Sequence, residues 1–239
     1  MNGIFQHSTV GALAAGLDDG TMTIGALLRH GTFGLGTFDA LDGEMIILDG
    51  TCHHLHADGT VTPATDDDTT PFAVITEFAP SLTLPLPAGS TTRTELIELL
   101  ESHLPGDNYF YAIRIDGYAT KVTTRTVRKQ HKPYPSLLAA AHGESVQTFD
   151  QVRGTFVGFR SPDYVGTITV AGYHLHFIDD ERTRGGHVLD FVLAEGAVAV
   201  DKIRDFRLRL PDGPQFAATE LTGAQTVQDI AAAEGSRPP

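Results

Sequence analysis

The chain is dominated by short runs in which apolar and polar residues alternate, the pattern of a half-buried β-strand. Asp-Gly pairs at 42–43, 49–50 and 58–59 separate the first of these runs and predict tight turns between strands. Another Asp-Gly pair, at 116–117, predicts a hairpin with alternating residues on both arms. The other extended runs that we predict as strands are residues 72–78, 110–127, 148–162, 166–180, 185–203 and 205–211.

Helical spacing of apolar residues is confined to three stretches. Residues 1–30 are predicted to be helical with short breaks, and Ser8 is placed to cap the first helix. Residues 92–103 carry the clearest apolar stripe, which Pro105 ends. Residues 224–234 show helical spacing again near the end of the sequence. Helices are therefore expected to be few and peripheral.

Runs of strands with helices at their edges, without regular alternation of the two, favour an α+β fold with mixed or antiparallel sheets. We place a boundary near residues 145–150. It divides the chain into an N-terminal part, residues 1–147, with a mixed sheet, and a C-terminal part, residues 148–239, which is rich in β-strands and ends in a helix. A chain of 239 residues can also form one compact unit.

The net charge of the chain argues against some classes of binding partner. Lys and Arg number 17 against 30 Asp and Glu, which gives a net charge of −13 and disfavours binding to nucleic acids and to anionic membrane surfaces. No apolar run is long enough to span a membrane, and the N-terminal segment lacks the basic start of a signal peptide. Cys52 is the single cysteine, so an intramolecular disulfide is excluded. We expect a cytoplasmic protein that acts on a small molecule.

The residues that most strongly indicate chemistry lie in YHLHFIDDERTRGGHVLDF, residues 173–191. His174 and His176 are two positions apart on a predicted strand, so both imidazoles project from one face. A polar turn with two glycines follows, and His187 opens the return strand, where it can lie opposite His176. Three histidines that leave a fourth position open are the ligand set of a catalytic zinc ion. From the spacing alone, an incidental arrangement of surface histidines is the alternative to a metal site.

A second pair of alternating histidines lies upstream, in the segment Cys52-His53-His54-Leu55-His56. The strand predicted after its Asp-Gly turn carries no His, Asp, Glu or Cys, so no third ligand is expected to converge there. We interpret these three histidines as surface residues or as supports for other groups.

Taken together, these stretches resemble the α-acetolactate decarboxylase family. The similarity is carried by QHSTVGALAAGLDDG, HGTFGLGTFDALDGEMIILDG, TTRTVRKQHKPYPSL, FRSPDYVGTITVAGYHLHFIDDERTRGGHVLDF and the last helix, in this order. One stretch departs from the family pattern, because TCHHLHADG stands where relatives have aromatic and polar residues.

The resemblance implies a mixed sheet and a smaller β-barrel-like sheet with a metal between them, and a homodimer. It implies that His174, His176 and His187 hold a zinc ion and that no organic cofactor is needed. It assigns functional roles to Glu44 in LDGE and to Arg125 in TTRTV. It also assigns one to a glutamate near the C-terminus, Glu234.

The activity that the resemblance implies is zinc-dependent decarboxylation of (S)-2-acetolactate to (R)-acetoin and CO2, a step of acetoin and butanediol biosynthesis. Two alternatives fit parts of the pattern. One is a cupin-like metal-dependent dioxygenase or isomerase, which also uses alternating histidines on a strand and usually a glutamate soon after them; here Asp179, Asp180 and Glu181 follow, at the turn. The other is a non-catalytic domain that binds a small molecule.

Overall fold

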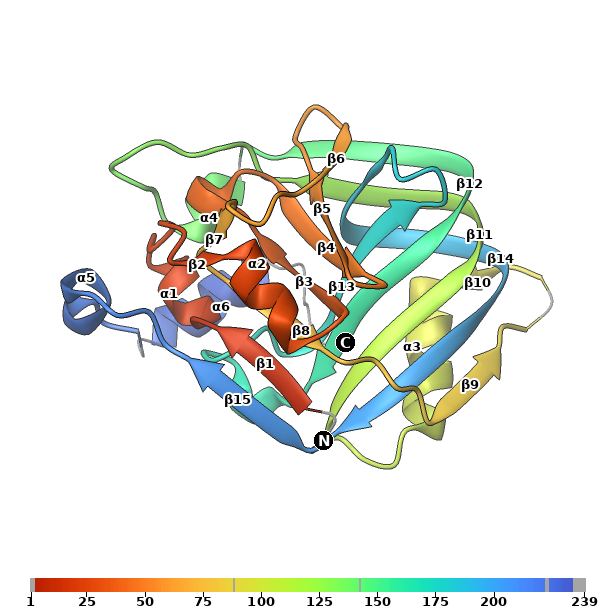
Figure 1. Ribbon diagram of the computed structural model, residues 1–239. Coiled ribbons are helices and arrows are strands. Elements are labelled where there is room, and N and C mark those ends of the chain that lie inside the picture. Colours follow the sequence, from red (N-terminus) through yellow and green to blue (C-terminus); the bar gives the residue numbers. More distant parts are fainter. Residues whose placement is uncertain (1–2, 88, 142, 222–223, 234–239) are drawn as a thin grey trace.

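The computed structural model describes residues 3–87, 89–141, 143–221 and 224–233. Its strands form two large sheets that pack against each other, with the helices at the periphery (Figure 1). In the described residues no helix is both long and apolar enough to cross a membrane. The α+β class predicted from the alternation of apolar residues is confirmed.

The first sheet contains seven strands and is mixed. Its strands are β1 (Gly3–His7), β3 (Phe33–Thr37), β4 (Glu44–Leu48), β5 (Thr51–Leu55), β6 (Val61–Pro63), β8 (Ala73–Thr76) and β15 (Asp205–Arg209). Their order is β15-β1-β8-β3-β4-β5-β6, and only the β1–β15 pair is parallel among them. Two short strands, β2 (Met22–Thr23) and β7 (Thr69–Thr70), pair separately. The turns at 42–43, 49–50 and 58–59 join consecutive strands as predicted.

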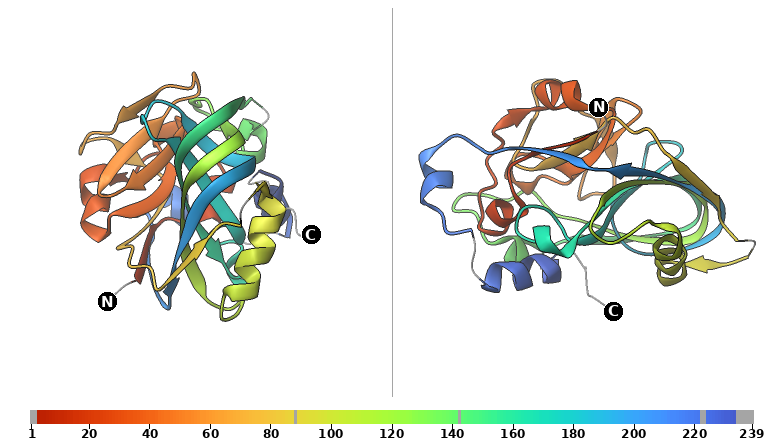
Figure 2. Two further views of the ribbon diagram at one scale, coloured as in Figure 1. Left: turned by 90° about the vertical axis from the view of Figure 1, so that its right-hand side faces the viewer. Right: turned by 90° about the horizontal axis from the view of Figure 1, so that it is seen from below.

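The second sheet is antiparallel and curls into a barrel-like form. Its strands are β9 (Leu82–Pro85), β10 (Thr91–Thr92), β11 (Phe110–Thr126), β12 (Ser145–Ser161), β13 (Gly172–Asp179) and β14 (Gly185–Ile203). The long strand β14 pairs with β11 along most of its length and with β13 at its start, which closes a ring through β12. The right-hand view of Figure 2 shows this ring from its end.

The hairpin predicted at Asp116-Gly117 is wrong, because β11 runs straight through this position. Gly117 pairs with Gly154 of β12 on one side and Gly196 of β14 on the other. A Cβ on Gly117 would overlap the backbone of β14, so glycine here permits close approach of β11 and β14. The local turn signal was overridden by pairing on both edges.

The helices cover the edges of the two sheets. They are α1 (Val10–Ala14), α2 (Ile24–Leu27), α3 (Arg93–His103), α4 (Leu137–Ala141), α5 (Pro214–Ala218) and α6 (Ala224–Ala233), with short 3-10 turns at η1 (Leu28–His30), η2 (Asp39–Leu41) and η3 (Asp163–Val165). The prediction for residues 1–30 is partly wrong: β1 occupies residues 3–7, and Thr9 rather than Ser8 caps α1. The helix predicted at 92–103 is confirmed, with a capping box between Thr92 and Glu95.

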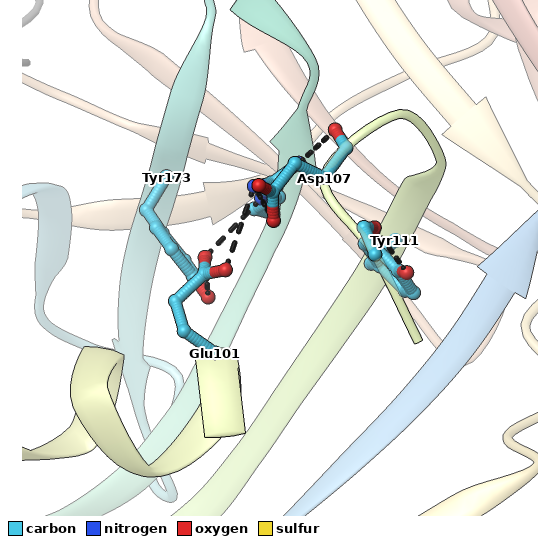
Figure 3. A network of polar contacts seen from close by, with 6 residues as sticks. Glu101, Asp107, Tyr111 and Tyr173 are labelled. Carbon is cyan, nitrogen blue, oxygen red and sulfur yellow. Dashed lines mark hydrogen bonds and ion pairs between the residues drawn. The ribbon is translucent and has the colours of Figure 1, made fainter. Parts of the chain in front are cut away.

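Helix α3 is fixed to the outside of the barrel by a polar network (Figure 3). Glu101 of α3 accepts hydrogen bonds from the Tyr173 hydroxyl, at 2.8 Å, and from the Arg160 guanidinium, at 3.3 Å. Arg160 also donates to the Asp107 carbonyl at 2.5 Å, and the Tyr111 hydroxyl donates to the Gly106 carbonyl at 2.7 Å. This network holds β13 at the residue directly before His174.

Three apolar clusters fill the molecule. One lies between the two sheets and is built by residues of both, such as Ile46 of β4 and Val157 of β12. A second fills the barrel under α3, and a third lies on the outer face of the mixed sheet under α2. A division of the chain at 147/148 stays a prediction; that junction falls inside β12, whose partner β11 precedes it.

Candidate metal centre

The three predicted histidines converge on the face of the barrel sheet that meets the mixed sheet. His176 of β13 lies directly opposite His187 of β14, and His174 lies two residues before His176 on the same face. The ring centroids are 5.0 Å apart for His174–His176 and for His174–His187, and 5.3 Å for His176–His187. One ligand nitrogen of each ring lies within 4.8 Å of the others. The predicted cluster is therefore present.

All three imidazoles are buried, with exposed fractions of 8%, 1% and 3% for His174, His176 and His187. Burial, together with the nearby Arg125 guanidinium, lowers the pKa of His174 to about 3. This imidazole is therefore neutral at pH 7, the form in which histidine binds a metal ion.

A backbone carbonyl of the mixed sheet orients His176, and a carboxylate of the same sheet lies beside it. Its Nδ1 is 2.9 Å from the Met45 carbonyl oxygen. A carbonyl only accepts, so Nδ1 carries the hydrogen and Nε2 presents its lone pair. That Nε2 lies 3.5 Å from Oε2 of Glu44, the neighbour of Met45. An imidazole held by a carbonyl on one nitrogen is the usual arrangement of a metal-binding histidine.

Glu44 reaches the histidines because of strand alternation. It opens β4, and its side chain is on the face of Ile46, which belongs to the core between the sheets. The turn before it is held by Thr37, whose hydroxyl donates to the Gly43 carbonyl at 2.7 Å. Gly43 has a φ of +79°, a conformation that favours glycine. The LDGE segment thus places the buried Glu44 carboxylate next to the imidazoles.

Arg125 approaches from β11, where it lies opposite His187. Its side chain is buried, and its guanidinium forms an ion pair with Glu144 at 3.0 Å. Glu144 was not singled out from the sequence, since nothing in HGES distinguishes it from a surface glutamate. The ion pair places the positively charged guanidinium of Arg125 beside the histidines, and the Glu144 carboxylate holds it there.

The candidate residues line one cavity between the sheets. Its wall includes Glu44, Arg125 and the three histidines, together with Thr37 and apolar residues of α1, η2 and α4. Glu234 lies outside the described residues. Helix α6 ends one residue before it, at Ala233, which belongs to the same apolar cluster as Leu13 and Leu137 of the cavity wall.

The acidic residues after the histidine pair do not complete the site. The Asp179 carboxylate accepts hydrogen bonds from the backbone and side chains of Thr183 and Arg184 and so ties the turn of the hairpin. The cupin-like pattern, with an acidic ligand shortly after the pair, is therefore not formed by Asp179. Instead, Glu44 supplies the carboxylate from the other sheet.

These donors fit a divalent metal ion of the zinc type. Three imidazoles at mutual ligand distances within 4.8 Å, with a carboxylate adjacent, match the ligands that zinc takes in catalytic sites. The fold and the site thus define a two-sheet protein with a buried cluster of three histidines whose geometry fits a metal ion.

Comparison with known proteins identifies the family. Residues 4–223 match the model of the family described as alpha-acetolactate decarboxylase. The alpha-acetolactate decarboxylase of Bacillus subtilis is 43% identical over 98% of this chain and 91% of its own length, and that of Methanosarcina mazei is 42% identical over 95% and 78%. A crystal structure of the Bacillus subtilis protein superposes with a TM-score of 0.94 at 43% identity, covering 97% of this chain and 99% of that one.

A Staphylococcus aureus structure, described as a protein of unknown function similar to alpha-acetolactate decarboxylase, gives a TM-score of 0.93 at 33% identity, covering 98% of this chain and 100% of that one. The chain belongs to the alpha-acetolactate decarboxylase family. The predicted family and enzyme class, carboxy-lyase, are thereby confirmed.

Proposed function

We propose that this enzyme catalyses zinc-dependent decarboxylation of (S)-2-acetolactate to (R)-acetoin and CO2. The observation that carries the proposal is the meeting of three imidazoles, Glu44 and Arg125 in one cavity of a chain of this family. Family membership favours this activity over the cupin-like enzyme and over a non-catalytic binding domain. No organic cofactor is invoked, because the ketone of the substrate accepts the electrons itself.

The substrate carries a carboxylate, a tertiary hydroxyl and an adjacent ketone. When the bond to the carboxylate breaks, its electron pair moves toward the ketone oxygen, which gains negative charge. A zinc ion held by His174, His176 and His187 would act as a Lewis acid toward that charge. The chain's own part is to orient the substrate, exclude water and place a proton.

Arg125 is placed to bind negative charge on the substrate. A guanidinium is always charged and can donate to two oxygens of one carboxylate. Its guanidinium is paired with Glu144 through Nη1, and its side chain lines the cavity that holds the three histidines. We assign it to the substrate carboxylate or to the enediolate left after CO2 departs.

The enediolate must take a proton on one face of the carbon to give one acetoin enantiomer. A carboxyl group in a water-poor cavity suits this step. We assign the donor role to Glu234 and give Glu44, beside His176, the role of orienting the substrate or completing the ligand shell.

The test is CO2 release from 2-acetolactate by the purified enzyme, alongside metal analysis. We expect stoichiometric zinc and rapid CO2 release, and loss of both in His187→Gln. Oxygen uptake by the iron-loaded protein in place of CO2 release would favour a cupin-like activity. A folded, zinc-containing protein that releases no CO2 would favour a binding domain. Either result would refute the proposal.

Glu234→Gln separates the proton donor from the metal ligands. We expect zinc to stay bound while turnover falls strongly, because the amide cannot supply a proton at this step. Turnover close to that of the unmodified enzyme would exclude Glu234 as the donor and shift the role to Glu44.

We further propose a cytoplasmic homodimer. The net charge of −13 supports a small-molecule partner over a nucleic acid or a membrane surface. Sedimentation of the purified protein tests the dimer.

A further inference from the structure

A second group of metal-binding side chains lies on the opposite face of the mixed sheet. In the β4–β5 pair, Glu44 lies opposite Leu55, whose side chain enters the core between the sheets. Met45 lies opposite His54 and faces the outer cluster, so His54 and His56 project outward. The sheet therefore separates these two histidines from the buried histidine trio.

The third member of this group is Asp42, from the turn before β4. One ligand atom from each of Asp42, His54 and His56 lies within 4.8 Å of the others, and all three side chains are partly exposed. The two imidazole rings are tilted by 36° relative to each other, with their centroids 3.8 Å apart. A third ligand is thus present, although it comes from the preceding turn and not from the strand after the pair.

The surroundings hold these side chains in place. Nε2 of His54 is 2.5 Å from the Asp42 carbonyl oxygen, so it carries the hydrogen and leaves the lone pair on Nδ1. This is the same kind of support that the Met45 carbonyl gives to His176. The Phe38 ring stacks on the His54 imidazole, with 3.9 Å between ring centroids. The ring is therefore oriented before any ligand arrives.

The carboxylate and the second imidazole have contacts that a metal ion can replace or share. Lys129 contacts Oδ2 of Asp42 at 3.3 Å, with both side chains partly exposed, so the ion pair is weak. Nε2 of His56 is 2.8 Å from the Thr62 hydroxyl, which can donate or accept.

We propose that Asp42, His54 and His56 form a second, solvent-accessible site for a transition-metal ion, with water completing its coordination. Two imidazoles and one carboxylate suit Zn²⁺ or Cu²⁺ and disfavour Ca²⁺ and Mg²⁺, which prefer oxygen ligands throughout. The site binds more weakly than the buried one, because Lys129 opposes the added positive charge and water competes at the surface.

The test is calorimetric titration of the purified holoenzyme with ZnCl2 after dialysis that removes loosely held metal. We expect one additional equivalent of zinc per chain. His54→Gln and His56→Gln, singly and together, should abolish this equivalent, while His103→Gln, at another exposed histidine, should keep it. Absence of the additional equivalent in the unmodified enzyme, or its persistence in the double variant, would overturn the proposal.

A second measurement does not depend on the variants folding. Cu²⁺ added to the unmodified holoenzyme should give an electron paramagnetic resonance spectrum with hyperfine splitting from two imidazole nitrogens. A spectrum with no nitrogen splitting would also overturn the proposal. Because the calorimetric titration counts only the zinc added to the holoenzyme, its outcome does not depend on the decarboxylase activity.

Discussion

The mixed sheet reaches both ring nitrogens of His176: the Met45 carbonyl accepts a hydrogen bond from Nδ1, and the Glu44 carboxylate lies 3.5 Å from Nε2. The two successive residues of β4 can do this because one contributes its backbone and the other its side chain. Replacing Met45 with another apolar residue would keep the carbonyl, whereas replacing Glu44 removes its contribution. The identity of the side chain therefore matters at Glu44, whereas the geometry of the backbone matters at Met45.

The histidine trio was predictable because its members lie on one local hairpin, where strand alternation fixes the faces. Glu44 and Arg125 were identified only through the family resemblance, since each comes from a distant strand. Glu144 was not predicted, because the only sign of its role is its ion pair with Arg125, which the sequence does not reveal. Pairings across the two sheets have no signature in a single sequence.

Asp18 gives a prediction about pH and stability. It is fully buried, and burial, followed by the charges of Asp19 and Asp39, raises its pKa from 3.8 to about 7. The folded protein then holds a proton that the unfolded chain releases, so this group makes stability fall as pH rises from about 4 to about 7. Each pKa unit is worth about 1.4 kcal/mol.

Asp18→Asn should remove this dependence. We expect its free energy of unfolding, relative to that of the unmodified protein, to increase as pH rises from 5 to 7 and to level off above that range. Urea denaturation at a series of pH values measures it, with Asp212→Asn as an exposed control. Parallel pH profiles for Asp18→Asn and the unmodified protein would contradict the assignment.

At the scale of secondary structure, glycines decide where strands approach closely. The Asp-Gly signal predicted turns correctly at 42–43, 49–50 and 58–59 but failed at 116–117, where glycine serves strand packing instead. The two uses cannot be separated by local sequence, because both depend on the missing Cβ. The N-terminal strand β1 was not predicted either. Its five residues pair with β8 on one side and β15 on the other, and both partners are distant in the sequence.

Gly158→Ala should disturb the metal centre through β13. A Cβ at this position would overlap the carbonyl oxygen of His174 and the side chain of Leu175, so β13 must shift. Overpacking of this kind costs about 1–3 kcal/mol. We expect lower thermal stability and weaker zinc binding, measured by calorimetry and by competition with a chelator.

Gly213→Ala is the matched control, because a Cβ there meets nothing within 4 Å. Unchanged zinc affinity in Gly158→Ala would show that β12 and β13 can separate without moving the ligands.

For the molecule as a whole, the two sheets share one core. The cluster between them contains residues of β3, β4 and β8 as well as β11, β12 and β14, and it surrounds the cavity. The sequence predicted two sheets but could not predict that β15 would return to β1, or that β12 would span the expected boundary. Those features depend on contacts between residues far apart in the sequence.

We therefore expect a single cooperative unfolding transition in calorimetry. Ile46→Ala, in the fully buried core between the sheets, should lower the free energy of unfolding by about 2–5 kcal/mol and move that one transition. Val146→Ala, at a side chain 56% exposed, should change it little. Two separate transitions, with Ile46→Ala shifting only one of them, would instead support independent parts divided near residue 147.

The placement of the three imidazoles on adjoining arms of one ribbon has a consequence for assembly of the enzyme. A hairpin between residues close in the sequence forms quickly, whereas pairing of strands that are distant in the sequence is slower. The three candidate ligands can thus come together on the β13–β14 ribbon before Glu44 and Arg125 pack against them. If the cluster holds the proposed zinc ion, we expect metal binding to precede catalytic competence during folding.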